Sequence, residues 1–180
     1  MVDRYTKQAR KYKPDKTPIL FIAEAPPNSI DRYFYFEDVR TRDWLWIALM
    51  RALFPFEWTQ PKEQRGRKRS WLEKFRDSGF YLIDAVKSPI TGTRRQRVTK
   101  IRENADTLIA EIRTIDPECI ILIKATVHEA ICEKFKVAGL PIANKAPLPF
   151  PSSGQQGKFH ERFLQLDCVK KFIAESKRRK

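Results

Sequence analysis

Residues 18–28 of the sequence read PILFIAEAPPN, a short apolar segment that ends at two consecutive prolines. An apolar segment of this length, followed by residues that interrupt backbone hydrogen bonding, predicts a buried strand over 18–24 and then a turn. Two further segments have the same character, FYLIDAV over 80–86 and ECIILIK over 118–124. These three segments are expected to form the centre of a parallel sheet, because strands buried on both faces are apolar throughout.

The segments between these strands are predicted to be helical. Apolar residues over 38–53 and 98–115 recur every three or four positions, which is typical of amphipathic helices. Shorter helices are predicted over 70–77, 126–137 and 158–175. Strands that alternate with helices of this length predict right-handed crossovers and helices on both faces of the sheet.

The expected fold is therefore α/β, with a three-layer α/β/α architecture around a central, mainly parallel four-stranded sheet. The extended segment 147–151 (PLPFP) is the candidate for the fourth strand. The length of 180 residues fits one domain over 1–180, with basic N- and C-terminal extensions. We expect this domain to be a monomer.

Composition excludes several classes of protein. The longest apolar segment, Trp44 to Met50, is far shorter than the roughly 20 residues that a membrane-spanning helix needs, so we expect neither a membrane span nor a signal peptide. Cys119, Cys132 and Cys168 form no CxxC pair, and Cys119 and Cys132 lie in apolar segments, so we expect these two to be buried thiols. The expected compartment is a reducing cytoplasm, or the nucleoid or nucleus if the protein binds DNA. We predict no disulfide scaffold, metal site or cofactor.

Positive charge is clustered along the chain. The sequence has 36 Lys and Arg against 22 Asp and Glu, a net charge of +14. Within residues 62–69 five of the eight side chains are basic, and residues 87–102 contain six basic side chains and no acidic one. Clustered positive charge of this kind indicates a polyanion-binding surface, and nucleic acid is the expected partner.

Four polar segments follow the predicted strands, at 24–28, 84–87, 124–126 and 150–153. Ligands of open parallel sheets bind at the carboxyl ends of the strands, so we expect these segments to surround one pocket. The sequence has no phosphate-binding glycine loop and no GxSxG or HExxH motif. Glu24 is the carboxylate of the first loop. The aromatic segment 33–36 (YFYF) follows it, and one of its rings could stack on a flat ligand such as a base.

These segments resemble the motifs of the uracil-DNA glycosylase superfamily over residues 18–165. AEAPP at 23–27 is similar to the water-activating motif after the first strand, in its GEAPG form. YLIDAVKSP at 81–89 resembles the second-strand motif, in which an Asn reads the base, and CIILIKATVH at 119–128 is similar to the third strand and its helix. Residues 150–160 resemble the late motif that opens with a catalytic His and inserts into the duplex.

The resemblance implies a DNA glycosylase that flips a damaged or deaminated base, uracil or a related one, and hydrolyses its N-glycosidic bond. Glu24 would be the catalytic carboxylate, with Asp31 in reserve. The residues implied to surround the base are Ala25, Phe34, Tyr35, Asp84 and Phe150. Those implied to contact DNA, single- or double-stranded, are Lys87, Arg94, Arg95, Arg97, Ser152, Ser153, Gln155 and Lys158.

The chain departs from the motifs at three places. Ala25 stands where several branches have Asp or Asn, Phe150 stands where the late motif usually has His, and the cysteine cluster of the iron–sulfur branch is absent. Two other functions therefore stay open: a non-catalytic nucleic-acid-binding protein with the same fold, and an enzyme that acts on a small nucleoside or nucleotide.

Asp84 stands where the motif has the base-reading Asn. A carboxylate only accepts hydrogen bonds, so it faces the exocyclic oxygen of uracil with like partial charge, whereas a protonated carboxyl regains a donor. We expect weak recognition of uracil and a gain on replacement by Asn. The alternative is that Asp84 forms an ion pair with Lys87 or another basic neighbour and does not contact the base.

Overall fold

The computed structural model describes residues 3–29, 32–38, 42–59, 63–64, 66–152 and 154–178. The elements follow one another along the chain as α1 (Arg4–Lys11), β1 (Ile19–Ala23), α2 (Trp44–Leu53), α4 (Lys68–Asp77), β2 (Phe80–Asp84), α5 (Arg94–Glu103), α6 (Ala105–Ile115), β3 (Cys119–Leu122), α7 (Ala125–Val137), α8 (Gln156–Leu164) and α9 (Asp167–Arg178).

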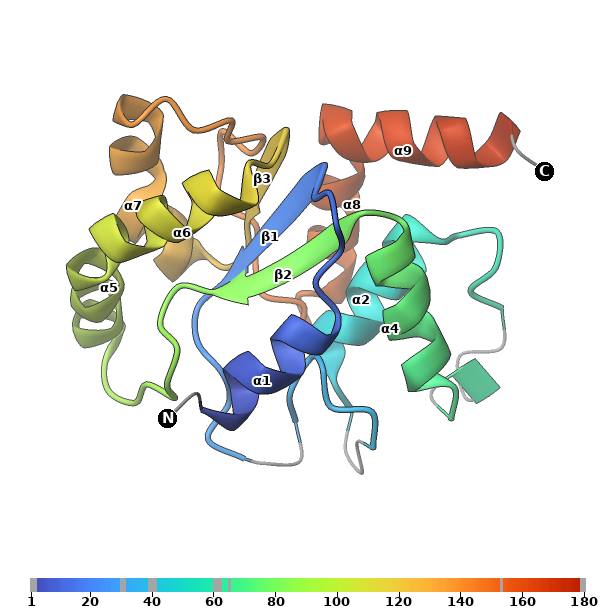
Figure 1. Ribbon diagram of the computed structural model, residues 1–180, viewed down its shortest axis with the longest axis horizontal. Coiled ribbons are helices and arrows are strands. Elements are labelled where there is room, and N and C mark those ends of the chain that lie inside the picture. The colour runs from blue at the N-terminus through green and yellow to red at the C-terminus, as the bar shows by residue number, and fades with distance from the viewer. Residues whose placement is uncertain are drawn as a thin grey trace.

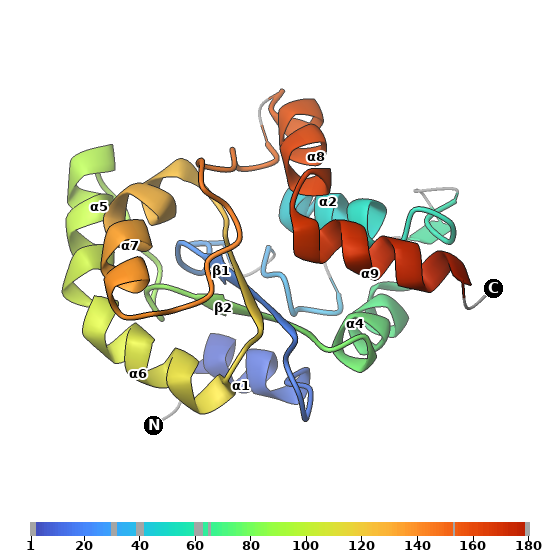
Figure 2. The ribbon, with the colours of Figure 1, turned by 90° about the horizontal axis from the view of Figure 1, so that it is seen from above.

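The predicted strands pair in parallel in the order β2-β1-β3. Ile19 at the start of β1 lies opposite Phe80 on one side and Cys119 on the other. Helices α5, α6 and α7 lie on one side of the sheet, and α2, α4, α8 and α9 lie on the other (Figures 1 and 2). This arrangement explains why every strand residue is buried and why the strands carry continuous apolar segments. None of the helices in the described ranges is long and apolar enough to cross a membrane.

The prediction of a fourth strand is wrong. After α7 the chain returns along β3 but makes only two isolated parallel bridges, Ile142 with Ile120 and Leu148 with Ile123. Prolines interrupt this segment at positions 141, 147, 149 and 151, and proline has no N–H to donate to a neighbouring strand. The sheet formed by the described residues therefore has three strands, and β2 and β3 are its edges.

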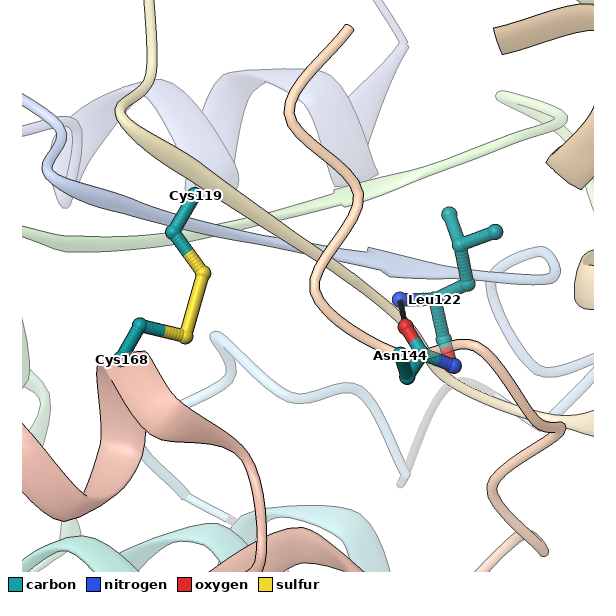
Figure 3. The surroundings of a disulfide bond; sticks show 4 residues. All are labelled: Cys119, Leu122, Asn144 and Cys168. Carbon is teal, nitrogen blue, oxygen red and sulfur yellow. Dashed lines mark hydrogen bonds between the residues drawn. A yellow bond between two sulfur atoms is a disulfide. The ribbon is translucent and has the colours of Figure 1, made fainter. Parts of the chain in front are cut away.

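On each edge of this sheet, one side chain forms hydrogen bonds with the backbone amide and carbonyl of a leucine. On the β2 edge the Tyr35 hydroxyl accepts a hydrogen bond from the Leu82 amide at 2.7 Å and donates one to the Leu82 carbonyl at 3.0 Å. On the β3 edge the Asn144 side chain accepts from the Leu122 amide at 2.8 Å and donates to its carbonyl at 3.1 Å (Figure 3). These contacts satisfy backbone groups that would otherwise be buried without a partner.

Helix boundaries differ from the prediction at several places. The predicted helix over 98–115 is divided into α5 and α6 at Asn104, whose side chain donates to the Lys100 carbonyl at 3.0 Å. The predicted helix over 158–175 is likewise divided into α8 and α9. Helix α2 begins only after Asp43, whose carboxylate accepts from the Trp46 amide at 3.1 Å and caps the helix.

A disulfide joins Cys119, the first residue of β3, to Cys168 in α9 (Figure 3). The expectation that Cys119 is a free buried thiol is therefore wrong. The two residues are 49 positions apart in the sequence, and their Cα atoms lie 6.8 Å apart only because α9 packs near the start of β3. Cys132 is buried and free, as predicted.

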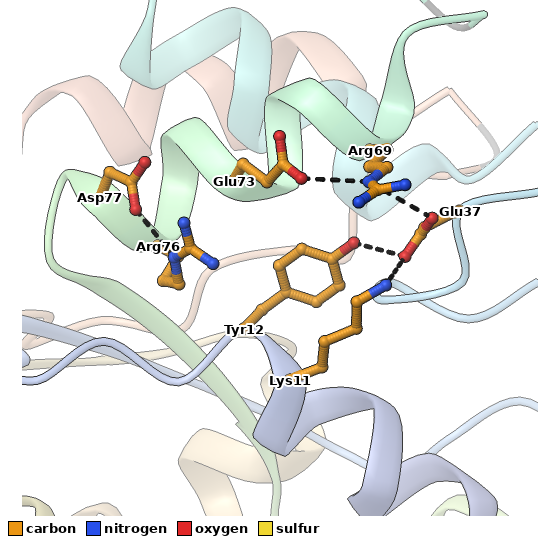
Figure 4. A network of polar contacts seen from close by, with 7 residues as sticks. All are labelled: Lys11, Tyr12, Glu37, Arg69, Glu73, Arg76 and Asp77. Carbon is orange, nitrogen blue, oxygen red and sulfur yellow. Dashed lines mark hydrogen bonds and ion pairs between the residues drawn. The ribbon is translucent and has the colours of Figure 1, made fainter.

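A polar network attaches α1 to the rest of the domain (Figure 4). The Glu37 carboxylate accepts hydrogen bonds from Lys11 and, at 2.7 Å, from the Tyr12 hydroxyl, and Arg69 of α4 lies 3.9 Å away. The hydrogen bond from Lys11 is the main reason why the pKa of Glu37 is lowered. The predicted basic N-terminal extension thus contains a packed helix.

The Tyr35 contact with Leu82 can be tested by removing one hydroxyl. Tyr35→Phe leaves a buried N–H and a buried carbonyl without partners, so we expect the free energy of unfolding to fall by about 1–3 kcal/mol. Urea denaturation measures this change. Tyr81→Phe is the matched control, because the Tyr81 hydroxyl has no hydrogen-bond partner among the described residues. Equal losses in both variants would contradict this role of Tyr35.

Candidate functional site

A cavity of about 280 Å³ lies at the carboxyl end of the sheet. The four polar segments predicted to meet there all contribute to it: Glu24 and Ala25 after β1, Asp84 at the end of β2, Lys124 after β3, and Phe150 with Ser152 in the late loop. Further lining residues come from the aromatic segment and the start of α2: Arg32, Tyr33, Phe34, Arg42, Asp43, Trp44 and Leu45. The topology therefore brings together segments that are far apart in sequence.

A larger cavity of about 620 Å³ lies at the opposite end of the sheet. Its walls include the first residues of all three strands, Ile19, Phe80 and Cys119. It contains none of the predicted site residues. Because parallel sheets bind ligands at the carboxyl ends of their strands, the smaller cavity is the candidate site.

Glu24 is the most heavily bonded group of the cavity. Its side chain is only 9% exposed. One carboxylate oxygen accepts from Lys124 at 2.8 Å and from Arg97 at 3.3 Å, and the other accepts from the Thr126 hydroxyl. A carboxylate has about four acceptor positions, so one position on the second oxygen remains for a water molecule. Two cations balance the charge of this buried carboxylate.

Lys124 has an unusual backbone conformation. Its φ of +85° and ψ of +139° lie in a region that residues other than glycine rarely adopt, at a cost of about 1–3 kcal/mol. The residue also caps the N-terminus of α7, where the helix dipole disfavours a positive charge. Glu24 offsets the second cost, and the side chain of Lys124 reaches the cavity with its ammonium 5.7 Å from the centre of the Phe150 ring.

Asp84 ends β2 inside the cavity wall and is 6% exposed. Burial raises the pKa of its carboxyl to about 7, although the charge of Lys87 and a hydrogen bond from Tyr33 act in the opposite direction. The Lys87 ammonium is bound to Glu111 at 2.6 Å. The alternative in which Asp84 forms a direct ion pair with Lys87 is therefore not the arrangement observed.

The aromatic segment is divided between cavity and core. Tyr33 and Phe34 line the cavity, whereas Tyr35 is completely buried and holds the edge of β2. This placement corrects the expectation that Tyr35 surrounds the base, since its hydroxyl is engaged by Leu82. Phe150 lies on the cavity wall and is partly buried, and its contact with a base stays a prediction.

The family model of the uracil DNA glycosylase superfamily matches residues 10–174. The chain belongs to this superfamily. The match covers all three strands and the segments that line the cavity, and it confirms the family that the motifs indicate. No curated protein matches the chain.

Members of the uracil DNA glycosylase superfamily act on DNA, yet much of the positive charge predicted for DNA contact is already paired in this member. Arg94 binds Glu129 at 2.6 Å, Lys87 binds Glu111, and Arg97 binds Glu24. Arg95 is exposed and has no ion-pair partner within the described part of the chain. It lies at the start of α5.

The remaining predicted positions lie around the late loop. Ser152 lines the cavity, Gln155 precedes α8, and Lys158 is exposed on the first turn of that helix. Asp31 and Ser153 lie outside the described residues. Among the described residues, no cluster of three His, Cys, Asp or Glu side chains could hold a metal ion.

Lys68 shows that a basic segment need not be a binding surface. This residue of the 62–69 segment is buried, donates to the Tyr33 carbonyl at 3.0 Å and pairs with Asp43 at 2.8 Å. Burial lowers its pKa, and Asp43 opposes that shift. Because Tyr33 and Asp43 both line the cavity, Lys68 fixes two parts of the cavity wall.

Lys124, Thr126 and Tyr33 are functional-site residues that the sequence does not single out, although Tyr33 belongs to the aromatic segment and Thr126 is predicted only as a helix cap, a position that Lys124 occupies. Lys124 and Thr126 lie in a segment that was predicted to reach the carboxyl end of the sheet, and their position directly after the third strand was the available signal. Nothing in the sequence indicated that both would contact Glu24, 100 and 102 residues away.

The raised pKa of Asp84 predicts a pH-dependent stability. Between its ordinary pKa of 3.8 and about 7, the folded protein binds a proton that the unfolded chain has released. Stability contributed by this group is therefore greatest below pH 4 and falls as the pH rises towards 7, by up to about 1.4 kcal/mol per pH unit. Urea denaturation of the wild type and Asp84→Asn at successive pH values measures the difference. A difference that does not change between pH 4 and 7 would contradict the shift.

Proposed function

We propose that this protein is a DNA glycosylase that hydrolyses the N-glycosidic bond of a flipped, deaminated base, with uracil as its first candidate substrate. The observation that supports this proposal most directly is the position of Asp84 in the same cavity as Glu24 and Phe34. One cavity thus offers a group that can read a base, a carboxylate that can hold water and an aromatic wall. Membership of the superfamily supports the same reaction class.

The size of the cavity favours a single base. Pockets for drug-sized ligands measure about 300–1,000 Å³, and this cavity, at about 280 Å³, is slightly smaller. A base paired inside a duplex cannot reach such a site and must first rotate out of the stack. Phe34 and Phe150 line the space that the base would enter, and stacking on an aromatic ring contributes about 1–3 kcal/mol per base.

Asp84 can read uracil when it is protonated. A carboxylic acid offers one donor and one acceptor, as an amide does, and uracil presents a carbonyl oxygen beside a ring N–H. Because the pKa of Asp84 is raised to about 7, this form is abundant in mildly acidic solution. Above pH 7 the carboxylate only accepts, and its charge opposes the carbonyl oxygen of the base.

Glu24 is suited to position the attacking water. Its one free acceptor position lies on the oxygen that binds Thr126, and its negative charge favours the positive charge that develops on the sugar as the bond breaks. Arg97 and Lys124 hold this carboxylate in one orientation. The carboxylate therefore needs little rearrangement during the reaction.

Uracil release as a function of pH tests the proposal. With single-stranded DNA that contains uracil, we expect single-turnover release by the wild type at pH 6 and a fall of about tenfold per pH unit above 7, because only the protonated Asp84 reads the base. Asp84→Asn should release uracil at a rate that is nearly constant from pH 6 to 9.

The same experiment separates the alternatives. Robust wild-type release that is unchanged up to pH 9 would show that Asp84 does not read the base. No release by either protein, with uracil, hypoxanthine or xanthine, would support a non-catalytic DNA-binding protein instead.

Exposed Arg95 predicts a contribution to DNA binding that depends on salt. A protein that neutralises one phosphate fewer should show a slope of log affinity against log salt that is shallower by about 0.9 for duplex DNA. We expect this reduction for Arg95→Ala. Arg113→Ala is the matched control, because Arg113 is an exposed arginine near the end of α6, just before the amino end of β3. Equal slopes for Arg95→Ala and the wild type would place the DNA elsewhere.

A further inference from the structure

The proposed hydrolysis creates a negative charge that the site must stabilise. When the bond between C1′ of the sugar and the base nitrogen breaks, its electron pair leaves with the base. A cationic donor that is already in place inside the cavity would stabilise this anion more in the transition state than in the substrate. The need for such a donor rests on the proposed function, and the contacts within the cavity indicate which residue supplies it.

Three cationic side chains line the cavity among the described residues: Arg32, Arg42 and Lys124. Arg32 and Arg42 are exposed, so water screens their charges. The Lys124 side chain is 27% exposed and lies against the buried Glu24. Its charge therefore acts in a less polar environment, where a given distance gives a stronger interaction.

The Lys124 ammonium has N–H groups that no described residue engages. A lysine ammonium has three N–H groups, and the described residues engage one of them, through the 2.8 Å contact with Glu24. The ammonium also lies over the ring of Phe150, which lines the same cavity. A base that stacks near Phe150 would therefore come within reach of the two remaining donors.

The position of Lys124 is locally unfavourable for a lysine. Its φ is positive, and its charge lies at the N-terminus of α7. Glycine would fit this backbone without strain. Strained backbone that is held in place by its surroundings is often found at functional sites, where it directs a side chain towards a ligand. Here the strained residue directs an ammonium into the cavity.

We propose that Lys124 is a catalytic residue of the glycosylase reaction. Its ammonium donates a hydrogen bond to the base as the C1′–N bond breaks, and so stabilises the anion that leaves. Water held by Glu24 adds to C1′ and loses one proton, and the departing base gains one, so the products are the free base and an abasic sugar.

Two bases of nearly the same shape test this role. In 5-fluorouracil the fluorine withdraws electrons, so this base leaves more easily and needs less stabilisation than uracil. We expect Lys124→Ala to slow single-turnover release of uracil at pH 6 by about 100- to 1,000-fold, the usual effect of removing one such donor. The loss with 5-fluorouracil should be smaller by about tenfold. Lys136→Ala, an exposed lysine at the other end of α7, is the control and should behave as the wild type with both bases.

Melting temperatures of two Lys124 variants distinguish a loss of catalysis from a loss of folding. Lys124→Gly relieves the backbone strain, so it should melt at a higher temperature than Lys124→Ala and lose uracil release to a similar degree. If the wild type is active and Lys124→Ala loses the same factor with uracil and with 5-fluorouracil, the proposed role of Lys124 is overturned and the proposed function is not. A lower melting temperature for Lys124→Gly than for Lys124→Ala would overturn the argument from strain. No release of either base by the wild type would overturn the proposed function and this inference together.

Discussion

A buried negative charge at the end of the central strand constrains the whole carboxyl edge of the sheet. Glu24 follows β1 directly, and its carboxylate needs donors because little water reaches it. Arg97 from α5, and Lys124 and Thr126 at the start of α7, supply them. The same contacts fix both helices against the strand, so the ion cluster that stabilises the carboxylate also determines the shape of the cavity.

The small sheet makes its edges important for the site. Three strands leave two edges, and Tyr35 and Asn144 each satisfy the amide and carbonyl of one edge leucine. The Tyr35 contact does more than protect β2. It also fixes the aromatic segment, in which Tyr33 and Phe34 line the cavity, and Lys68 donates to the Tyr33 carbonyl of the same segment. The stability of the sheet edge and the position of the aromatic wall therefore depend on one another.

Charge in the sequence and charge available to a ligand are different quantities in this protein. The net charge of +14 is large, yet Lys87, Arg94 and Arg97 each bind a carboxylate, and Lys68 is buried. These residues shape the fold and the cavity. Arg95 and Lys158, by contrast, are exposed, and no described carboxylate forms an ion pair with either. Local sequence could not distinguish the paired cations from the exposed ones, because the carboxylates that pair with them, such as Glu129 for Arg94, lie far away along the chain.

The three strands, their burial on both faces and the edge of the sheet where polar segments meet could all be predicted from the amino-acid sequence, because hydrophobic period and strand-end polarity are local properties. The family could be predicted as well, through motifs near Glu24 and Asp84. Four other features became evident only in the folded chain: Tyr35 faces the core, Cys119 meets Cys168, prolines leave the sheet with three strands, and Lys124 reaches Glu24. Each of these outcomes depends on contacts between distant segments, and their energies cannot be assigned until the packing of the helices is known.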